Sequence, residues 1–205
     1  MTLKKSLAVT TAAALALSLA ACSSDSSDSS ASGGDTGGDN YVLVNGTEPQ
    51  NPLVPGNTNE VGGGRIVDSI FAGLVYYDID GSAVNDVAES IELEGDKTYR
   101  ITIKDGQTFT DGTPVTAESF VNAWNYNVAN STLSSYFFES ILGYEEGVES
   151  MEGLQVVDDT TFTVELTQPE SDFPLRLGYS AFFPLPDSAL EDMAAFGENP
   201  VGNGP

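Results

Sequence analysis

The sequence predicts a folded body of mixed α and β structure, an α+β or mixed α/β class, that begins near residue 41. Three observations support this class. Residues 98–104 alternate polar and apolar side chains, as a half-buried strand does. Residues 116–129 repeat apolar side chains at helical spacing. Residues 154–166 contain two strand-like runs separated by two aspartates, which is typical of a hairpin.

The N-terminal residues 1–21 are predicted to be a signal peptide. Lys4 and Lys5 precede an uncharged run rich in Ala and Leu, which is short for a membrane-crossing helix. The run ends in Leu-Ala-Ala directly before Cys22, the single cysteine of the chain. This spacing resembles a bacterial lipobox, in which the cysteine is lipidated and becomes the new N-terminus. An ordinary cleaved signal followed by a free thiol is the alternative.

Residues 22–40 are predicted to form a lipidated and disordered tether. After the cysteine, this segment contains only Ser, Gly, Asp, Ala, Thr and Asn. No apolar burial can therefore offset the entropy lost on ordering it. An acylated end followed by a flexible spacer predicts a body held at the extracytoplasmic face of the bacterial cell membrane by its lipid anchor.

The first elements of the body follow from local pattern. Residues 41–44 are apolar and largely β-branched or aromatic and stop at an Asn-Gly pair, which predicts a buried strand. Residues 47–64 are rich in Pro, Asn and Gly and predict a loop. Apolar side chains four positions apart predict a helix over 65–74. Residues 75–77 then predict a strand that enters a turn.

Thr116 is predicted to cap the helix over 116–129, with an inner face made of Phe120, Val121, Trp124 and Val128. Residues 133–142 predict a second helix. Residues 182–186 predict an extended apolar stretch.

A last short helix is expected near the end of the chain, capped by Asp187 or Ser188 and ending near Gly197. The chain then stops in a loop over residues 199–205, with no element after it. Domains usually tie down their termini or trail off in polar residues. We therefore expect this sequence to be the N-terminal part of a longer protein.

The composition excludes several classes of function. The chain has 31 acidic and 7 basic residues, a net charge of −24, so we expect no nucleic-acid partner. It has no histidine, which excludes histidine acid–base catalysis and histidine-ligated zinc. There is no P-loop, nucleophile elbow or Cys-x-x-Cys motif. The sequence predicts no catalytic residue, no metal site and no cofactor.

Two acidic segments allow weaker interpretations. Residues 78–89 partly match a calcium loop, but Ala83 stands where that loop requires glycine, so a hairpin turn is favoured. Residues 145–149 contain three glutamates that could serve a secreted carboxylate-dependent hydrolase. Their clustered spacing is more typical of a solvated helix end. Aromatic side chains in the loops near residues 136–138 and 179–183 favour a binder of varied small ligands, although most should lie in the core.

Several stretches in chain order resemble extracellular solute-binding protein family 5, the peptide- and nickel-binding lipoproteins of ABC importers. Residues 99–121, YRITIKDGQTFTDGTPVTAESFV, are similar to the family's strand, "DG-x-x-F-x-DG-x-P-x-T-A" loop and helix. Shorter similar stretches are NGTEP at 45–49, GLVY at 73–76, VAES at 87–90 and NPVGNGP at 199–205.

The resemblance implies the N-terminal part of a two-lobed, periplasmic-binding-protein-like fold of class II, cluster C type. It divides the body into the start of domain I at 41–76, a small domain II at 77–198, and re-entry into domain I at 199–205, where this chain is truncated. The two lobes of such a protein would close by a hinge over the ligand.

The resemblance also implies a monomeric binding protein rather than an enzyme. Such a protein captures oligopeptides or dipeptides outside the membrane and delivers them to ABC permease subunits. Binding of a nickel chelate or another small solute is the alternative within the family. The positions at which the family contacts its ligand correspond here to two loops and one further tyrosine: Asn59, Glu60, Val61, Tyr179, Ser180, Ala181, Phe182 and Tyr136.

Overall fold

The computed structural model describes residues 43–204, and the chain from Asn45 onward forms one compact unit. The predicted signal peptide, Cys22 and the tether lie outside the described residues. The strand predicted at 41–44 is wrong in the half that is described. Leu43 and Val44 lie in no strand and are 91% and 77% exposed. An apolar run becomes a strand only where a neighbouring strand accepts its hydrogen bonds, and none pairs with it among the described residues.

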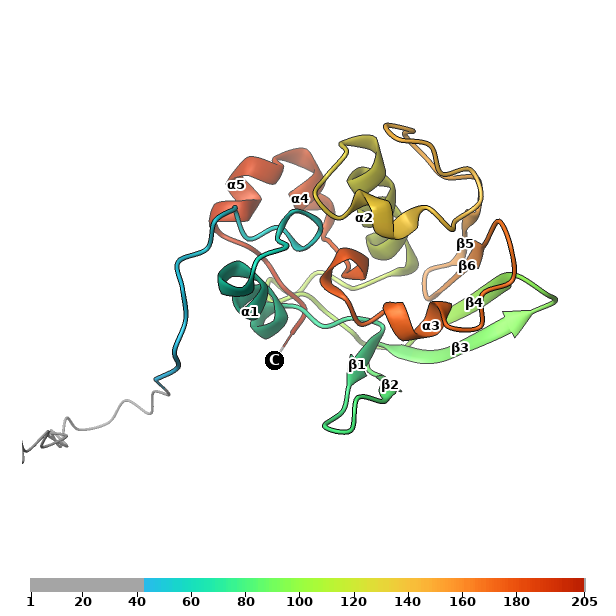
Figure 1. The fold of residues 1–205 in the computed structure, drawn as a ribbon, viewed down its shortest axis with the longest axis horizontal. Helices are drawn as coiled ribbons and strands as arrows, with labels where there is room; N and C mark the ends of the chain where they lie inside the picture. Colours follow the sequence, from blue (N-terminus) through green and yellow to red (C-terminus); the bar gives the residue numbers. More distant parts are fainter. Residues whose placement is uncertain (1–42, 205) are drawn as a thin grey trace, which may run out of the picture. The chain divides into compact units, whose positions relative to one another are not determined.

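The larger of the two sheets in the described chain has four antiparallel strands, and a helix packs on one of its faces (Figure 1). Its order is β3-β4-β6-β5, with bounds β3 Ala88–Glu94, β4 Thr98–Ile103, β5 Leu154–Asp158 and β6 Thr161–Glu165. Strand β4 buries Tyr99, Ile101 and Ile103, as its alternation predicts. The predicted hairpin is confirmed as β5 and β6, although Leu166 lies just beyond the strand.

Helix α2, Ala117–Ala129, covers one face of this sheet, and its predicted bounds and inner face are confirmed. Thr116 caps it: the Ser119 amide donates to the Thr116 hydroxyl at 3.4 Å, while the Thr116 amide donates to the Ser119 hydroxyl at 3.1 Å. Phe120 and Trp124 pack on Phe162 of β6, with ring centroids 5.8 and 5.6 Å apart. These contacts join the helix to the sheet in one hydrophobic core.

Helix α1, Val61–Ile70, begins and ends four residues earlier than predicted. It begins early because the Glu60 side chain caps it, accepting the Gly63 amide at 3.0 Å, so three glycines that predicted a loop are helical. It ends early because the following backbone pairs with the chain's end. The Gly204 amide donates to the Ile70 carbonyl at 2.7 Å, and Asn203 exchanges two 3.0 Å hydrogen bonds with the Ala72 backbone.

After α1, the chain forms a small antiparallel hairpin. Its strands are β1, Val75–Tyr77, and β2, Ala83–Asn85. The turn predicted after β1 is present. Asp80 holds it by accepting the Ser82 amide at 2.9 Å and the Ser82 hydroxyl at 2.6 Å. The acidic segment over 78–89 is therefore a hairpin and the strand that follows it. Within residues 43–204, no cluster of acidic, Cys or His side chains is arranged to hold a metal ion.

The helix predicted over 133–142 is a single 3-10 turn, η2, Ser135–Phe138. The prediction is wrong beyond that turn because the Leu142 amide donates to the Glu165 carbonyl at 2.9 Å instead of closing a helix. The remaining short elements are η1 Pro55–Asn57, α3 Phe173–Arg176, η3 Ser180–Phe182, α4 Asp187–Glu191 and α5 Met193–Glu198.

The single last helix predicted from the sequence is two helices, because Asp192 leaves the helical conformation and caps α5 by accepting the Ala195 amide at 3.0 Å. Among the described residues, no helix has the length and apolar character needed to cross a membrane. The division of the body at residues 77 and 199 stays a prediction.

The cap of α2 gives a direct test of this fold. Replacing Thr116 by Ala removes the hydroxyl that accepts the Ser119 amide, and we expect the free energy of unfolding of the full-length protein to fall by about 1 kcal/mol. The Thr116→Ser variant keeps a hydroxyl and should lose much less. Urea unfolding followed by circular dichroism measures both. Equal losses in the two variants would show that the cap does not stabilise α2.

Candidate functional site

The two loops predicted to contact a ligand meet at one cleft of about 570 Å³. Asn59, Glu60 and Val61 reach it from the start of α1, and Tyr179 and Ser180 reach it from the start of η3. The rest of the wall comes from α1, the segment after it, the β1–β2 hairpin and the end of η3: Thr58, Gly64, Asp68, Phe71, Ala72, Gly73, Val75, Tyr76, Tyr77, Asp86, Gly178 and Phe183.

Two glycines allow these segments to approach each other. A Cβ atom on Gly178 would lie 2.8 Å from the Val75 carbonyl, and one on Gly73 would lie 2.8 Å from the Phe183 ring. Either contact is closer than real side chains tolerate. The Tyr77 hydroxyl closes the same edge by donating to the Leu175 carbonyl at 2.7 Å. The cleft wall therefore depends on residues without side chains as well as on its aromatic rings.

Two predicted site residues have their side chains in the core instead. Ala181 and Phe182 are 1% and 0% exposed, and the Phe182 ring lies edge-on to Trp124 with centroids 5.2 Å apart. Their carbonyls are held by α2: Asn127 donates to the Ala181 carbonyl at 3.2 Å, and the Trp124 indole donates to the Phe182 carbonyl at 3.0 Å. These two residues fix the loop that presents Tyr179.

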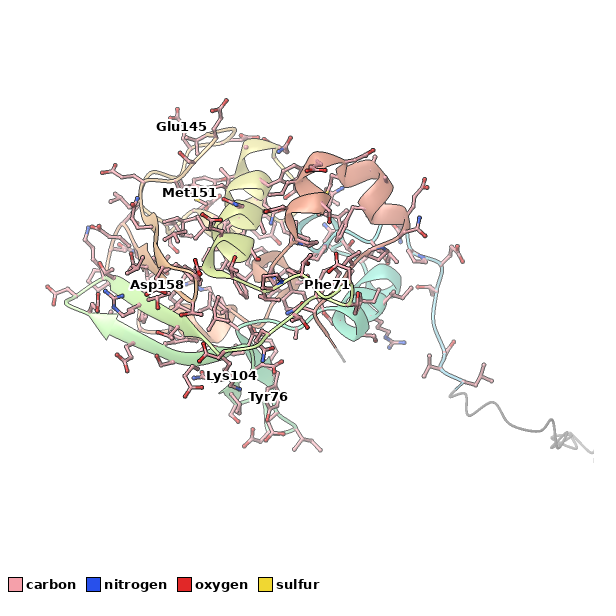
Figure 2. The ribbon with its side chains drawn as sticks, turned by 180° about the vertical axis from the view of Figure 1, so that it is seen from behind. Phe71, Tyr76, Lys104, Glu145, Met151 and Asp158 are labelled. Atoms are coloured by element: carbon pink, nitrogen blue, oxygen red, sulfur yellow. The ribbon has the colours of Figure 1, made fainter. Side chains whose placement is uncertain are left out.

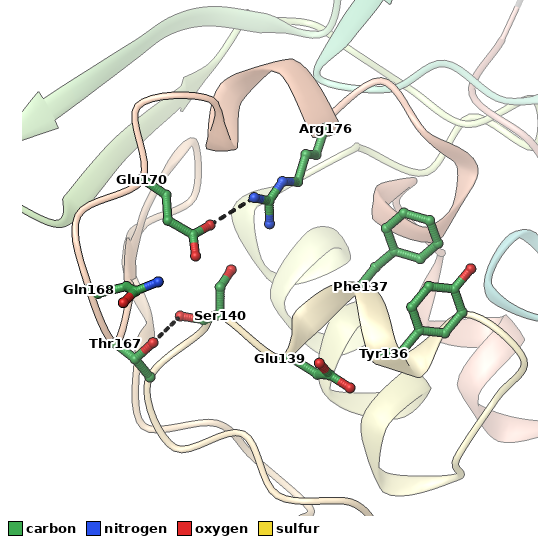
Figure 3. Close-up of a pocket in the computed structure, with 8 residues that line it drawn as sticks. All are labelled: Tyr136, Phe137, Glu139, Ser140, Thr167, Gln168, Glu170 and Arg176. Carbon is green, nitrogen blue, oxygen red and sulfur yellow. Dashed lines mark hydrogen bonds and ion pairs between the residues drawn. The ribbon is translucent and has the colours of Figure 1, made fainter.

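Tyr136 lies outside the cleft, in a second pocket of about 450 Å³ (Figure 3). This pocket is polar, and its basic group is already paired: Arg176 lies 2.9 Å from Glu170 and 3.2 Å from Asp172. The other lining residues are Phe137, Glu139, Ser140, Thr167 and Gln168. As Figure 3 shows, the Tyr136 and Phe137 rings lie at one end, away from the ion pair.

An aromatic stack joins the two pockets. The Phe137 ring centroid lies 4.5 Å from that of Tyr136 and 4.4 Å from that of Tyr179. Phe137 thus links two predicted site residues, Tyr136 and Tyr179. Phe137 itself was not predicted as a site residue. The run of three aromatics at 136–138 was the available signal, but periodicity could not show which of the rings would face Tyr179.

The ionisable side chains that line the cleft differ in their hydrogen bonds and in their pKa values. Glu60 caps α1, and hydrogen bonds from the Gly63 and Gln50 amides lower the pKa of its carboxyl. Asp68 accepts no such bond from the described part of the chain, and desolvation raises the pKa of its carboxyl. Burial, and then the neighbouring Tyr136 and Asp68, raise the pKa of the Tyr179 phenol. Asp68 carried no signal in the sequence, because it is a lone acidic residue between the apolar positions of α1.

The glutamates proposed as hydrolase acids lie elsewhere. Residues 145–149 form an exposed turn that lines neither pocket. Figure 2 shows Glu145 and the cleft residue Tyr76 at opposite ends of the view. No pair of acids facing a substrate is formed there.

Comparison with known proteins identifies the family. The family model for bacterial extracellular solute-binding proteins, family 5 middle, matches residues 82–205. This chain belongs to that family. It is a family of solute-binding proteins rather than of enzymes, and the fold predicted from the resemblance, the N-terminal portion of a periplasmic peptide-binding protein, is confirmed.

Individual relatives agree with this membership. The periplasmic oligopeptide-binding protein OppA of Escherichia coli is 32% identical over 166 residues, which are 77% of this chain and 30% of OppA. The probable deoxycholate-binding periplasmic protein YgiS of Escherichia coli is also 32% identical over 166 residues, which are 74% of this chain and 31% of YgiS. The chain thus spans just under a third of the length of these relatives.

Two solved structures share the fold. The Escherichia coli murein tripeptide-binding protein MppA matches with a TM-score of 0.70 and 26% identity, over 78% of this chain and 33% of MppA. Haemophilus influenzae OppA in complex with the peptide RPPGFSPFR matches with a TM-score of 0.67 and 29% identity, over 75% of this chain and 33% of that protein.

The close approach of Gly178 to the Val75 backbone can be tested by measuring the stability of a variant. We expect Gly178→Ala to lower the free energy of unfolding of the full-length protein by about 1–3 kcal/mol, because the new methyl group would meet the Val75 carbonyl. Gly64→Ala is the matched control, since nothing lies within 4 Å of its added methyl group and alanine favours the helix. Thermal unfolding of both variants measures the difference. A loss in Gly64→Ala as large as in Gly178→Ala would contradict this account.

Proposed function

We propose that this chain belongs to a lipid-anchored substrate-binding protein of an ABC importer, which captures oligopeptides or dipeptides outside the membrane and delivers them to the permease. The observation that carries the proposal is the cleft, at which both predicted ligand-contact loops meet in a chain of this family. The residues Asn59, Glu60, Val61, Tyr179 and Ser180 would line the binding site, with Ala181 and Phe182 supporting it from behind.

The chemistry of the cleft supports a binder of varied side chains. Its wall combines aromatic rings, among them those of Tyr76 and Tyr179, with polar and acidic groups, and aromatic faces pack against many apolar side chains without requiring one. Tyr136, through the stack with Phe137, would extend this surface beyond the cleft. The ligand would be enclosed when the rest of the protein closes over it by a hinge, as one monomer.

Two relatives support peptides as the class of ligand. OppA of Escherichia coli is named as an oligopeptide-binding protein, and the Haemophilus influenzae OppA structure contains a nonapeptide. A different solute is the competing proposal: YgiS is named as probably deoxycholate-binding, and a nickel chelate is the other alternative within the family. Deoxycholate is an anion, and the cleft lining within residues 43–204 carries three carboxylates and no Lys or Arg, which favours peptides.

Calorimetry on the full-length protein tests the proposal. We expect heat of binding with di- to pentapeptides from a diverse library, and a rise in the melting temperature on binding. The Tyr179→Ala variant should bind about tenfold more weakly because it removes the ring stacked on Phe137, whereas Tyr179→Phe should keep most of the affinity. The absence of heat and of thermal shift across the library would refute peptide capture. A response to nickel chelate or deoxycholate alone would support the competing proposal.

The anchor has its own test. We expect Cys22→Ser to abolish acylation and to move the protein from the membrane fraction to the soluble extracytoplasmic fraction, because a single thiol carries the predicted lipid. Labelling with a clickable fatty acid, followed by fractionation, measures both effects. Ser24→Ala is the control two residues away and should stay acylated. An unlabelled wild-type protein would contradict the lipobox.

A further inference from the structure

We propose that the cleft selects cationic peptides, and that Asp68 and Asp86 are the residues that determine this specificity. The inference rests on the proposed function, because it assigns a charge preference to the same cleft. The preferred ligands are peptides whose lysine or arginine side chain enters the cleft beside its aromatic wall.

The two carboxylates come from different segments of one wall. Asp68 lies in α1, and Asp86 lies between β2 and β3; both line the cleft. Neither takes part in an ion pair among residues 43–204, and neither side chain accepts a hydrogen bond there. The Asp86 backbone is anchored, since its amide donates to the Leu74 carbonyl at 2.9 Å. A fixed backbone therefore presents an unpaired carboxylate to the cleft.

No Lys or Arg lines the described part of the cleft, although the Lys104 amide donates to the Val87 carbonyl, next to Asp86, at 3.0 Å. Arg65, one turn before Asp68, donates to the Asn45 carbonyl at 2.8 Å and does not line the cleft. Arg176, close to Tyr179 in sequence, is paired with Glu170 and Asp172. The described part of the cleft thus holds negative charge without an internal cation to balance it.

The surroundings of Asp68 strengthen the effect of this charge. Desolvation raises the pKa of its carboxyl, so the charged form lacks part of the stabilisation that water would give it. A ligand cation at this position would restore that stabilisation. The charge of Asp68 also contributes, after burial and Tyr136, to raising the pKa of the Tyr179 phenol, which lines the same cleft.

The aromatic wall fits the rest of a basic side chain. Tyr76 and Tyr77 line the cleft and are about half exposed, which leaves ring faces accessible to a cation. The aliphatic stem of lysine or arginine can pack against the exposed Tyr76 ring while its charged head stays near a carboxylate. A neutral side chain gains only the apolar contact, and an anionic one meets unfavourable charge.

Three matched tripeptides test the preference in the full-length wild-type protein. Ala-Lys-Ala, Ala-norleucine-Ala and Ala-Glu-Ala share their termini and differ in the charge of one side chain. Calorimetry should show the lysine peptide binding about tenfold more tightly than the norleucine peptide, and the glutamate peptide most weakly. The lysine preference should shrink in 1 M NaCl, where charges are screened beyond roughly 3 Å.

Charge-removing variants locate the effect. Asp68→Asn and Asp86→Asn should each reduce the ratio of lysine to norleucine affinity by about five- to tenfold, because each removes a carboxylate that lines the cleft. Glu149→Gln changes the net charge equally on an exposed turn outside both pockets and should leave the ratio unchanged. Two separate positions keep the test valid if one variant does not fold.

The outcomes separate the two proposals. Equal affinity for the lysine and norleucine peptides in the wild-type protein would overturn the charge preference while leaving peptide capture intact. If both Asp68→Asn and Asp86→Asn keep the wild-type ratio of lysine to norleucine affinity, the assignment to these residues is overturned. Tighter binding of deoxycholate than of the lysine peptide would overturn it as well. Absence of binding to all three peptides and to the wider library would instead refute the proposed function.

Discussion

The hydrogen bond from the Trp124 indole to the Phe182 carbonyl is the interaction on which the arrangement of the cleft depends. Trp124 is completely buried on the inner face of α2, packed between the sheet and η3. A buried indole N–H needs an acceptor, and here the acceptor belongs to the loop that carries Tyr179. Asn127, one turn later, holds the neighbouring carbonyl in the same way. The core of the sheet thereby sets the position of one wall of the cleft.

The other wall depends on how α1 is held at its two ends. Glu60 caps its beginning, and the Asn203–Gly204 segment binds the backbone just after its last residue. Phe71 follows directly and stacks on Phe183, with ring centroids 6.3 Å apart. A segment near the end of the described chain thus fixes a helix near its beginning. The cleft wall is built from residues separated by more than one hundred positions, and its lining combines acidic groups with aromatic rings from the second loop.

The surroundings of each carboxylate decide whether it stabilises the local backbone or stays without a hydrogen-bond partner. Glu60, Asp80 and Asp111 all accept amide or hydroxyl hydrogen bonds within their own turns, and these bonds lower the pKa of each carboxyl. Such carboxylates stabilise local backbone and have little left to offer a ligand. Among residues 43–204, no group donates a hydrogen bond to Asp68, which lines the cleft. A carboxylate without such a bond is the better candidate to meet a ligand cation.

The sequence alone determined the elements whose pattern is local: the alternation of β4, the Thr116 cap and inner face of α2, and the β5–β6 hairpin. Its ordered family stretches also indicated the fold. Tertiary contacts decided the rest. Leu43 and Val44 had strand character but pair with no strand among the described residues, and the Leu142 amide donates to the Glu165 carbonyl of β6 instead of closing a helix. In the candidate site, sequence placed Asn59–Val61 and Tyr179 but not Asp68, Asp86 or Phe137, because which side chains face one another depends on the packing of distant segments.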